Sequence, residues 1–327
     1  MRVLVTGGAG FIGSSIADRL LDGGWDVTAL DSFDPYYDPE QKRRNVARAS
    51  RSGAYRLVEA DVRDGSAVQA TFETSSPDVV VHLAARAGVR RSVEEPASYV
   101  TTNELGGLNV LEACRRAGNV PIVFASTSSV YGNASPPFRE QDASEVPLSP
   151  YAASKRASEL MVRTYHYLYG LDAAILRFFT VYGPRGRPDM AFWKFTKALR
   201  HGEPLRLHGE TTARDFTYID DIVDGVVGAI DWVRARRGCD TFNIGRSEPV
   251  RVRRLIEMLA EALEVEARIE TGSLQPGESH VTAADVSKAA GAFGYSPQRG
   301  LAEGIASWVR WVDDSDEAPA ILRGSGS

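Results

Sequence analysis

Tyr151 and Lys155 are the residues whose types and spacing most directly suggest chemistry. They form the pattern Y-x-x-x-K, and residues four apart lie on the same face of a helix. A lysine ammonium near a phenol favours the phenolate and lowers the phenol pKa, so the tyrosine can act as a base near neutral pH. Upstream, the segment ASTSSVYG at 125–132 supplies hydroxyl groups that can hydrogen-bond a substrate oxygen. Together these groups predict a site that moves the proton of a substrate hydroxyl.

A glycine-rich segment near the start of the chain has the pattern of a dinucleotide site. Gly7, Gly10 and Gly13 follow the strand-like run Val3–Thr6 and precede a helix-like run. In such a turn the backbone N–H groups can approach a pyrophosphate, and the helix dipole favours that negative charge. Asp31 ends the next strand-like run, where a carboxylate accepts hydrogen bonds from a ribose diol and repels a 2′-phosphate. The pattern therefore predicts NAD rather than NADP as the cofactor.

The elements that must position these residues alternate along the first half of the chain. Strand-like runs cover residues 3–6, 26–30, 55–60, 78–83, 121–126 and 173–178. Helix-like runs cover residues 12–21, 105–117 and 151–168. Continuous β-branched runs such as DVVVHL at 78–83 are typical of strands buried in a parallel sheet. Strand–helix alternation with short connections predicts an α/β fold with a doubly wound parallel sheet.

The second half has a looser pattern, which predicts a smaller α/β domain that binds the substrate. Helices are expected at 190–200, 252–263 and 305–312. The expected division is a cofactor domain at 1–178 with a return segment near 214–245, a discontinuous substrate domain at 179–318, and a disordered tail or cloning remnant at 319–327. The long polar connection between Asp31 and Tyr55 is predicted to carry function or to cover a ligand.

Composition excludes several classes of partner. The net charge of −5 argues against nucleic acid as a partner. A solvated helix face is the interpretation of the basic residues Lys42, Arg43, Arg44, Arg48 and Arg51. No apolar run approaches the length that crosses a bilayer, so no membrane partner is expected. Cys114 and Cys239 lack metal-ligand spacing, so we expect no metal and a cytoplasmic, reducing compartment.

These motifs together resemble the extended short-chain dehydrogenase/reductase family, within its NAD-dependent epimerases and dehydratases. The resemblance covers nearly the whole chain, with TGGAGFIG at 6–13, HLAA at 82–85, STSSVYG at 126–132, YAASK at 151–155 and RDFTYIDD at 214–221. It implies a Rossmann fold, a UDP-sugar substrate and a triad in which Tyr151 is the base, Lys155 its partner and Thr127 the third member. It also implies a homodimer built on helices near Leu105 and Leu160.

The resemblance assigns binding residues by position. The implied cofactor residues are Gly7, Gly10, Phe11, Ile12, Gly13, Asp31, Ser32, Asp61, Val62, Leu83, Ala84, Ala85, Asn103, Ser126, Tyr151, Lys155 and Phe178. The implied substrate residues are Arg90, Thr127, Ser128, Ser129, Tyr151, Thr180, Arg187 and Arg214. Arg214 is expected to meet the substrate diphosphate, a role suited to a bidentate fork. Asp61 is nearly as well interpreted as a helix cap, and Gln275 stands where several relatives use Arg.

Ser128 and Ser129 help to choose among the reactions of the family. Relatives that are 4,6-dehydratases usually carry Asp-Glu there, and UDP-glucuronate decarboxylases usually carry Glu just before V-Y-G. The segment RFFTVYGPRGRPDMAFWKF at 177–195, with DSFDPYYDP at 31–39, resembles UDP-glucuronate 4-epimerases instead. That resemblance implies that Thr180 and Arg187 lie near the C5 carboxylate.

Further candidates and simpler interpretations accompany these positions. Arg86 and Arg90 are additional candidates for the carboxylate. Thr180 could instead pack under the nicotinamide, and Arg187 could be a solvated loop cation. Three other residues are interpreted as structural: His82 as a buried strand residue, and Trp308 and Trp311 as packing a helix.

The combined prediction is interconversion of UDP-glucuronate and UDP-galacturonate, with bound NAD and a 4-keto intermediate. One alternative is a 4-epimerase of neutral sugars such as UDP-glucose or UDP-N-acetylglucosamine. A second is a UDP-glucuronate decarboxylase. A third, of a different class, is a non-catalytic dinucleotide sensor on the same fold, which the intact triad argues against.

Overall fold

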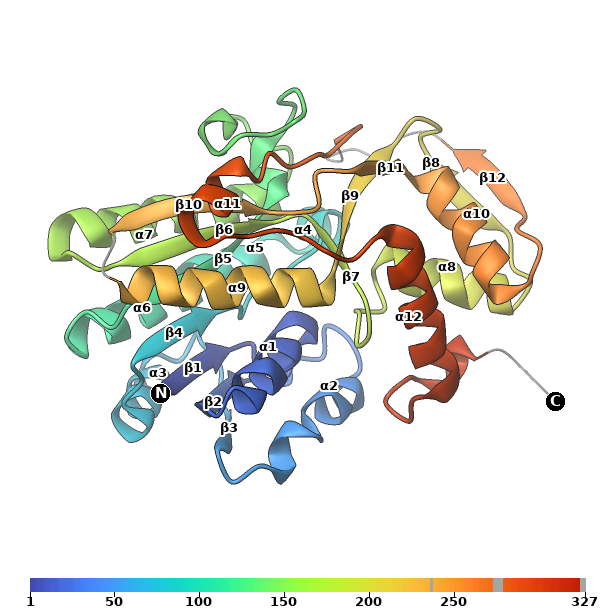
Figure 1. Cartoon of the computed structure of the whole chain (residues 1–327). Helices are drawn as coiled ribbons and strands as arrows, with labels where there is room; N and C mark the ends of the chain where they lie inside the picture. The colour runs from blue at the N-terminus through green and yellow to red at the C-terminus, as the bar shows by residue number, and fades with distance from the viewer. Residues whose placement is uncertain (236–237, 273–278, 324–327) are drawn as a thin grey trace.

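A sheet of parallel strands forms the largest element of the computed structural model, which describes residues 1–235, 238–272 and 279–323 (Figure 1). Seven strands form this sheet in the order β10-β6-β5-β4-β1-β2-β3. Their bounds are β1 (Arg2–Thr6), β2 (Asp26–Asp31), β3 (Tyr55–Glu59), β4 (Val79–His82), β5 (Ile122–Thr127), β6 (Ala173–Phe178) and β10 (Cys239–Ile244). The order runs outward in both directions from the β1–β4 pair, and ligands of such sheets bind beyond the carboxyl ends of the strands at that point. The doubly wound sheet predicted from the sequence is therefore confirmed.

Alternate residues of the strands face two separate apolar cores. Val3 and Val5 belong to one core, and Leu4, between them, belongs to the other. On the first face lie α1 (Phe11–Asp22) and α9 (Ile219–Arg234), and on the second lie α3 (Gly65–Ser75), α6 (Gly106–Arg116) and α7 (Pro150–Tyr169). Both faces are covered, which explains why the strands read as continuous apolar runs.

A smaller part lies beyond one end of the large sheet (Figure 1). It holds a three-stranded sheet, a two-stranded parallel sheet and several helices. Their bounds are β7 (Thr180–Tyr182), β9 (Ala213–Tyr218), β11 (Pro249–Arg251), β8 (Leu205–His208), β12 (Ile269–Gly272), α8 (Ala191–Arg200), α10 (Val252–Leu263) and α12 (Leu301–Asp314). The helices expected at 190–200, 252–263 and 305–312 are thus present, the last longer at both ends.

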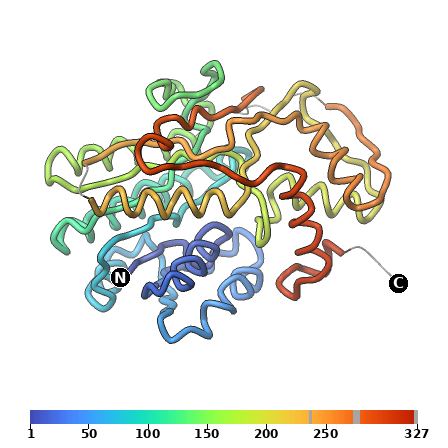
Figure 2. The backbone as a smooth tube through the Cα atoms, in the orientation of Figure 1, coloured from blue at the N-terminus to red at the C-terminus, as the bar shows by residue number. Residues whose placement is uncertain are grey.

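The chain passes more than once between the two parts, as Figure 2 shows for the stretch from β9 through α9 and β10 to α10. β10 pairs with β6 at the edge of the large sheet, whereas β9 pairs with β7 and β11 in the small one. A further helix, α11 (Ser287–Phe293), packs beside β10 and α9. A second return to the large sheet therefore occurs inside the range predicted for the substrate domain.

Short helices complete the connections. They are α2 (Pro39–Val46), α4 (Val89–Glu94), α5 (Pro96–Tyr99), the π-helical turn η2 (Val100–Leu105) and the 3-10 turns η1 (Ala49–Arg51), η3 (Ser128–Tyr131), η4 (Glu140–Asp142) and η5 (Ala320–Leu322). The η5 turn corrects the prediction of a disordered tail from 319, because Leu322 is fully buried and Arg323 Nε donates to the Val312 carbonyl. Residues 324–327 lie outside the described ranges.

Three expectations from the sequence concern membrane-spanning helices, the cysteines and metal sites. Among the described residues, no helix is long and apolar enough to cross a membrane. Cys114 and Cys239 are both free. In the same described ranges, no group of three or more His, Cys, Asp or Glu side chains is arranged to hold a metal ion.

Candidate active site

A cavity of about 440 Å³ opens at the carboxyl ends of the central strands. It is lined by nearly all the residues that the sequence predicted for the cofactor: Gly7, Gly10, Phe11, Ile12, Gly13, Asp31, Ser32, Asp61, Val62, Leu83, Ala84, Ala85, Ser126, Tyr151, Lys155 and Phe178. These residues come from the carboxyl ends of six strands, β1 to β6, or the segments that directly follow them, and from the first turns of α7, so the parallel sheet gathers them at one edge. We name this space the cofactor cavity.

The glycine turn at the floor of the cavity packs too tightly against neighbouring backbone to accept side chains at two positions. Gly7 has φ +69°, and a Cβ there would lie 2.8 Å from the backbone nitrogen of Ala84. A Cβ on Gly13 would overlap the carbonyl oxygen of Gly7. Gly10 forms the N-cap of α1, so the helix begins with backbone N–H groups at the cavity wall. This cradle fits the pyrophosphate of a dinucleotide.

Asp31 lies at the end of β2 with both carboxylate oxygens fixed. Oδ2 accepts a hydrogen bond from the Ala9 backbone N–H at 3.0 Å, and Oδ1 accepts one from Phe33 N–H at 2.9 Å. Lys42 also lines the cavity, with Nζ 3.6 Å from Asp31 Oδ1. The prediction of a solvated face is therefore wrong for Lys42, which is only 7% exposed because the inner face of α2 packs onto the glycine turn.

Thr127 and Tyr151 meet in the cofactor cavity at the carboxyl end of β5. Thr127 ends β5, and Tyr151 is in the first turn of α7, where the Ser149 hydroxyl accepts the Ala152 N–H and caps the helix. Burial raises the pKa of Tyr151, and a hydrogen bond with the Thr127 side chain opposes that rise. The sequence predicted that Lys155 would lower this pKa; that prediction is wrong for this structure, because burial outweighs the groups that favour the phenolate.

Lys155 lies one turn after Tyr151 and is 3% exposed. Burial lowers its pKa to about 8, against an opposing attraction from Glu159. His82 faces the same region, and burial with the nearby Lys155 charge lowers its pKa to about 3, so the imidazole is neutral. His82 Nδ1 bonds Thr6 Oγ1 at 2.7 Å, which confirms the interpretation of His82 as a buried strand residue.

The burial of Lys155 predicts a pH-dependent stability in protein freed of cofactor. Its folded pKa is about 8 and its ordinary value is 10.5, so between these pH values the unfolded state binds a proton that the folded state has released. Stability rises with pH wherever the unfolded state binds more protons. The free energy of unfolding of the natural protein minus that of Lys155→Met should be flat below pH 8 and increase up to about 10.5. Urea unfolding across this range measures it, and a flat difference would contradict the shifted pKa.

A buried ion pair stands behind the triad. Glu159 and Arg177 are 0% and 1% exposed and join through two hydrogen bonds of 2.8 and 2.7 Å. The Ser126 hydroxyl donates to Glu159 Oε1 at 2.6 Å. Burial raises the Glu159 pKa, but these bonds outweigh it and hold the pKa below its ordinary value. This pair ties α7 to the ends of β5 and β6 and so fixes where Ser126 and its neighbour Thr127 lie.

A second cavity of about 730 Å³ adjoins the first, and we name it the substrate cavity. Ser128, Ser129 and Thr180 line both cavities, so these hydroxyls stand where the two meet. Arg90 and Arg214, predicted for the substrate, line the second cavity. Residues that the sequence did not predict also line it: Tyr36, Arg91, Lys194, Phe195, Arg206 and His208. The missed signal was a set of basic residues: Lys194 lies inside the 177–195 segment, and Arg206 and His208 belong to β8, shortly after it.

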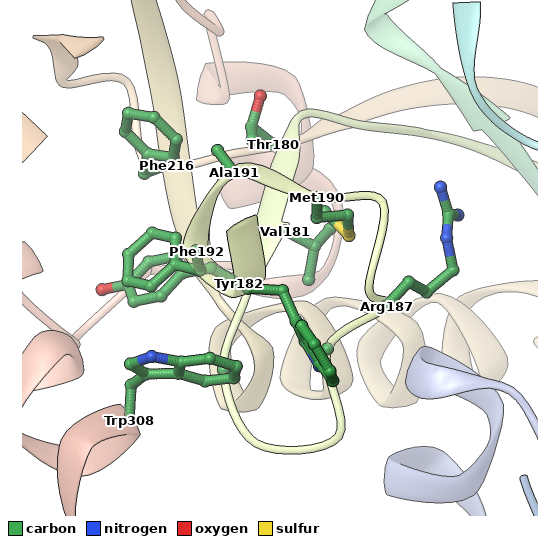
Figure 3. Close-up of a pocket in the computed structure, with 12 residues that line it drawn as sticks. Thr180, Val181, Tyr182, Arg187, Met190, Ala191, Phe192, Phe216 and Trp308 are labelled. Carbon is green, nitrogen blue, oxygen red and sulfur yellow. The ribbon is translucent and has the colours of Figure 1, made fainter. Parts of the chain in front are cut away.

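Arg187 lies in the loop after β7 and lines the cofactor cavity. Its guanidinium donates to both oxygens of Asp189, at 2.9 and 2.7 Å, and Asp189 also accepts from the Tyr36 hydroxyl at 3.3 Å. Figure 3 shows Arg187 on the right of the view, extending away from the aromatic side chains Phe192, Phe216 and Trp308 on the left. The side chain is 24% exposed, so it is a partly buried, paired cation rather than a freely solvated one.

Aromatic side chains pack together beside this loop (Figure 3). Tyr182 stacks on Phe192 with ring centroids 4.2 Å apart, and Trp308 packs edge-on to Phe192. Trp308 Nε1 donates to Thr196 Oγ1 at 2.8 Å. Both Trp308 and Trp311 are buried, which confirms their predicted packing role. The cluster anchors α8 and α12 to β7, and so holds the loop that carries Arg187.

Asn103 and the RDFTYIDD motif have structural partners. The Asn103 amide accepts from Arg86 N–H and donates to the Arg86 carbonyl and the Ser154 hydroxyl, so it holds the loop beside the cavity. Arg214 Nη1 donates to the carbonyls of Ala213 and His280. Asp215 accepts the N–H groups of residues 246, 247 and 284. Gln275 lies outside the described residues.

Comparison with known proteins agrees with this geometry. The chain is 44% identical to UDP-glucuronate 4-epimerase 2 of Arabidopsis thaliana, over 95% of this chain and 75% of that protein. It is 40% identical to UDP-glucuronate 4-epimerase of Thermodesulfobacterium geofontis, over 96% of this chain and 97% of that protein. A crystal structure of UDP-glucuronic acid 4-epimerase from Bacillus cereus, in complex with UDP-glucuronic acid and NAD, superposes with a TM-score of 0.90 at 36% identity, covering 95% and 99% of the two chains.

The family model matches most of the chain as well. The matched residues, 3–245, run from the first strand to the end of β10 and include the glycine turn and all three members of the triad. The chain belongs to the NAD dependent epimerase/dehydratase family.

Proposed function

We propose that this protein is an NAD-dependent nucleotide-sugar 4-epimerase that interconverts UDP-glucuronate and UDP-galacturonate. The observation that carries the choice of substrate is the group of Ser128, Ser129 and Thr180 hydroxyls at the junction of the two cavities. A sugar whose C4 lies at Tyr151 would place its C5 substituent at this junction. The similarity of this chain to named UDP-glucuronate 4-epimerases supports the same choice of substrate.

The cofactor residues fit the group that the reaction requires. When bound, NAD accepts a hydride from C4 of the sugar and returns it to the opposite face. The glycine turn would hold the pyrophosphate, Asp31 the adenosine ribose, and Lys155 the nicotinamide ribose. Tyr151 would take the proton of the sugar O4, with Thr127 hydrogen-bonded to the phenol. We assign the cofactor role to 1–178 with the later return to the sheet, and the substrate role to the smaller part.

An epimerase that acts on a uronate must also prevent loss of CO₂. The 4-keto form of UDP-glucuronate is a β-keto acid, and it decarboxylates fastest when the breaking C–C bond stands perpendicular to the carbonyl plane. Ser128, Ser129 and Thr180 offer short hydroxyl donors that can hold the carboxylate away from that geometry. A neutral sugar could not make the hydrogen bonds that these donors offer to a carboxylate, so the site would disfavour it.

The rival functions differ in what this junction must supply. A 4,6-dehydratase needs an acid and a base beside the sugar, and Ser128 and Ser129 supply neither at the positions where relatives carry Asp-Glu. A neutral-sugar 4-epimerase and a UDP-glucuronate decarboxylase use the same triad. Decarboxylases of the family usually carry Glu where this chain has Ser129, and the products distinguish both rivals from the proposed reaction. A dinucleotide sensor would have no need of Thr127, Tyr151 and Lys155 together.

One assay tests the proposal against these rivals. Purified protein is incubated with UDP-glucuronate and, separately, with UDP-glucose, and products are separated by chromatography and identified by mass spectrometry. UDP-galacturonate is the expected main product. Equal turnover of UDP-glucose would contradict the proposed binding of the C5 carboxylate at Ser128, Ser129 and Thr180. A mainly decarboxylated product would contradict epimerisation itself.

Truncating the side chains that we propose to hold the C5 carboxylate should change the ratio of products. Thr180→Ala or Arg187→Ala is expected to lower epimerisation of UDP-glucuronate and to raise the fraction of UDP-4-keto-pentose, because the carboxylate loses donors that hold its C–C bond away from the perpendicular geometry. Arg200→Ala is a matched control, since Arg200 pairs with Asp313 away from both cavities. A product ratio in the pocket variants equal to that of Arg200→Ala would remove these residues from the pocket.

The quaternary structure that we propose is a homodimer in the cytoplasm. Apolar side chains are exposed on neighbouring helical segments: Val100 at 47%, Leu105 at 45%, Leu160 at 52% and Met161 at 39%. Burying such a patch against a second copy would remove it from water. Leu160→Glu is expected to shift the protein toward a monomer in sedimentation velocity, whereas a monomeric natural protein would contradict the proposal.

Free Cys114 and Cys239 support a reducing compartment.

A further inference from the structure

We propose that Arg185, Asp18 and Glu317 form a clasp that positions the Arg187 loop and so keeps Arg187 at the C5 carboxylate of the 4-keto sugar. The Arg187 loop is the segment 183–190 between β7 and α8. The inference rests on the proposed epimerase function and deepens it, because it assigns a positioning role to three residues, which we call the clasp residues, that lie outside the site.

The clasp is a buried group of charges. Arg185 Nη1 donates to Asp18 Oδ2 at 2.8 Å, and Nε and Nη2 donate to the two carboxylate oxygens of Glu317, each at 2.8 Å. The side chains of Arg185, Asp18 and Glu317 are 10%, 13% and 29% exposed. Charge-assisted bonds of this bidentate form fix the orientation of both groups, and burial reduces their screening by salt. The guanidinium is therefore held from two sides.

The two carboxylates belong to segments far apart in the chain. Asp18 lies on α1, the helix that begins at the glycine turn. Glu317 follows α12, and its backbone carbonyl accepts a hydrogen bond from Gln41 Nε2 of α2 at 3.4 Å. Ala318 is 5% exposed and Leu322 is fully buried, so this C-terminal segment is packed onto the protein. The clasp therefore joins the Arg187 loop to the helix that begins at the cofactor cavity and to the C-terminal segment.

The backbone at Arg185 has a conformation that bulky residues rarely adopt. Its φ is +66°, in the left-handed region, which is unfavourable for an arginine. The Gly186 N–H donates to the Gly183 carbonyl at 3.1 Å, so the strained residue lies inside a tight turn. Such strain persists only where surrounding contacts over-determine the conformation. The three bonds of the Arg185 guanidinium supply contacts of this kind.

Arg187 follows Arg185 after one intervening residue, so its place depends on the clasp. Arg187 lines the cofactor cavity, whereas the clasp residues, all within the described ranges, line neither of the two cavities. The carboxylate that pairs with Arg187 is Asp189 of the same loop, and this partner moves with the loop. A misplacement of about 1 Å in a group that contacts the substrate can cost about two decades in rate. The clasp thus acts on the reaction through Arg187.

The test compares Arg185→Asn, Glu317→Gln and the control Arg48→Asn with the natural protein. Asparagine adopts the left-handed conformation more readily than arginine, so Arg185→Asn removes the guanidinium without adding backbone strain. Arg48 pairs with the same Asp18, at 3.4 Å, but it is 53% exposed and lies outside the loop. Hydrogen exchange of peptides from 183–190 is measured without substrate. The fraction of UDP-4-keto-pentose formed from UDP-glucuronate is then measured by mass spectrometry.

The expected results separate positioning from a general loss of stability. Arg185→Asn should increase exchange in the loop peptides, raise the fraction of UDP-4-keto-pentose and lower kcat for epimerisation by about one to two decades. Glu317→Gln should change the same quantities less, because the amide keeps one acceptor oxygen, and it keeps the test decisive if Arg185→Asn does not fold. Arg48→Asn should match the natural protein. The product fraction does not depend on how much of the protein is folded, so a merely structural role would not change it.

Natural exchange in the loop of Arg185→Asn would overturn the clasp, since the loop would then keep its place without the guanidinium. A natural product fraction despite increased exchange would overturn the role of the clasp in the reaction. So would equal changes in Arg185→Asn and Arg48→Asn. If the natural protein forms no UDP-galacturonate, the proposed function fails instead, and the exchange comparison still decides whether the clasp holds the loop.

Discussion

Tyr151→Phe is expected to lower kcat for epimerisation of UDP-glucuronate by about two to four decades, the range for loss of a positioned acid–base group. The hydroxyl is the group that would take the O4 proton, and Thr127 is hydrogen-bonded to it. The ring should keep its place, because its contact with Tyr99, edge to face at 6.1 Å between centroids, does not use the hydroxyl. The rate loss should therefore appear in kcat with little change in thermal stability.

The matched control is Tyr167→Phe, which removes a phenol hydroxyl from the same helix at a position that is 87% exposed. It should leave kcat unchanged. Substrate deuterated at C4 supplies a second readout, since a hydride that returns from the cofactor leaves the deuterium in the product. A near-normal rate in Tyr151→Phe would remove this residue from the role of base, and washout of deuterium into solvent would indicate enolisation instead of oxidation.

Arg177→Met is expected to lower the free energy of unfolding by about 3–5 kcal/mol, the cost of breaking a buried ion pair from one side. The substitution removes the two bonds from the buried guanidinium to the fully buried Glu159 carboxylate, which keeps only the Ser126 hydroxyl and the partly exposed Arg156 as partners. It also frees the Tyr131 hydroxyl and the Glu140 carbonyl, to which Arg177 donates at 3.1 and 2.7 Å. Urea unfolding followed by circular dichroism measures the loss.

Two comparisons show whether the lost charge pairing of Glu159 causes the drop in unfolding free energy. The double variant Glu159→Gln/Arg177→Met removes both charges and should recover much of the loss, because a neutral buried pair has no unpaired ion. Arg139→Met, which breaks the exposed pair of Arg139 with Asp285, should cost about 1 kcal/mol or less. A double variant no more stable than Arg177→Met alone would show that lost packing, not charge, determines the effect.

Local spacing in the sequence was enough to predict the glycine turn and the Tyr151–Lys155 pair, whereas Thr127 was assigned by the resemblance to the family. A glycine turn between a strand and a helix needs only neighbouring residues, so the lining of the cavity by Gly7 and Gly13 could be expected. The same holds for Tyr151 and Lys155, because four residues along a helix bring two side chains to one face whatever the rest of the chain does. Strand periodicity likewise predicted the parallel sheet, whose carboxyl edge gathers these groups.

Partners from distant segments could not be predicted in this way. Lys42 belongs to a polar run typical of a solvated helix, yet packing of α2 against Ala9 buries it beside Asp31. Nothing in the spacing of the RDFTYIDD motif shows that Asp215 is used by backbone groups from residues 246, 247 and 284.

The sequence by itself therefore determined which local units the chain builds and which reactive groups they carry, since backbone periodicity depends on near neighbours. Only the tertiary structure decided the charge environment of those groups, such as Asp31 beside Lys42 and the basic side chains of α8 and β8 around the substrate cavity. The physical reason is that burial and pairing depend on which remote segments pack together, and a buried charge takes its pKa and its role from those partners.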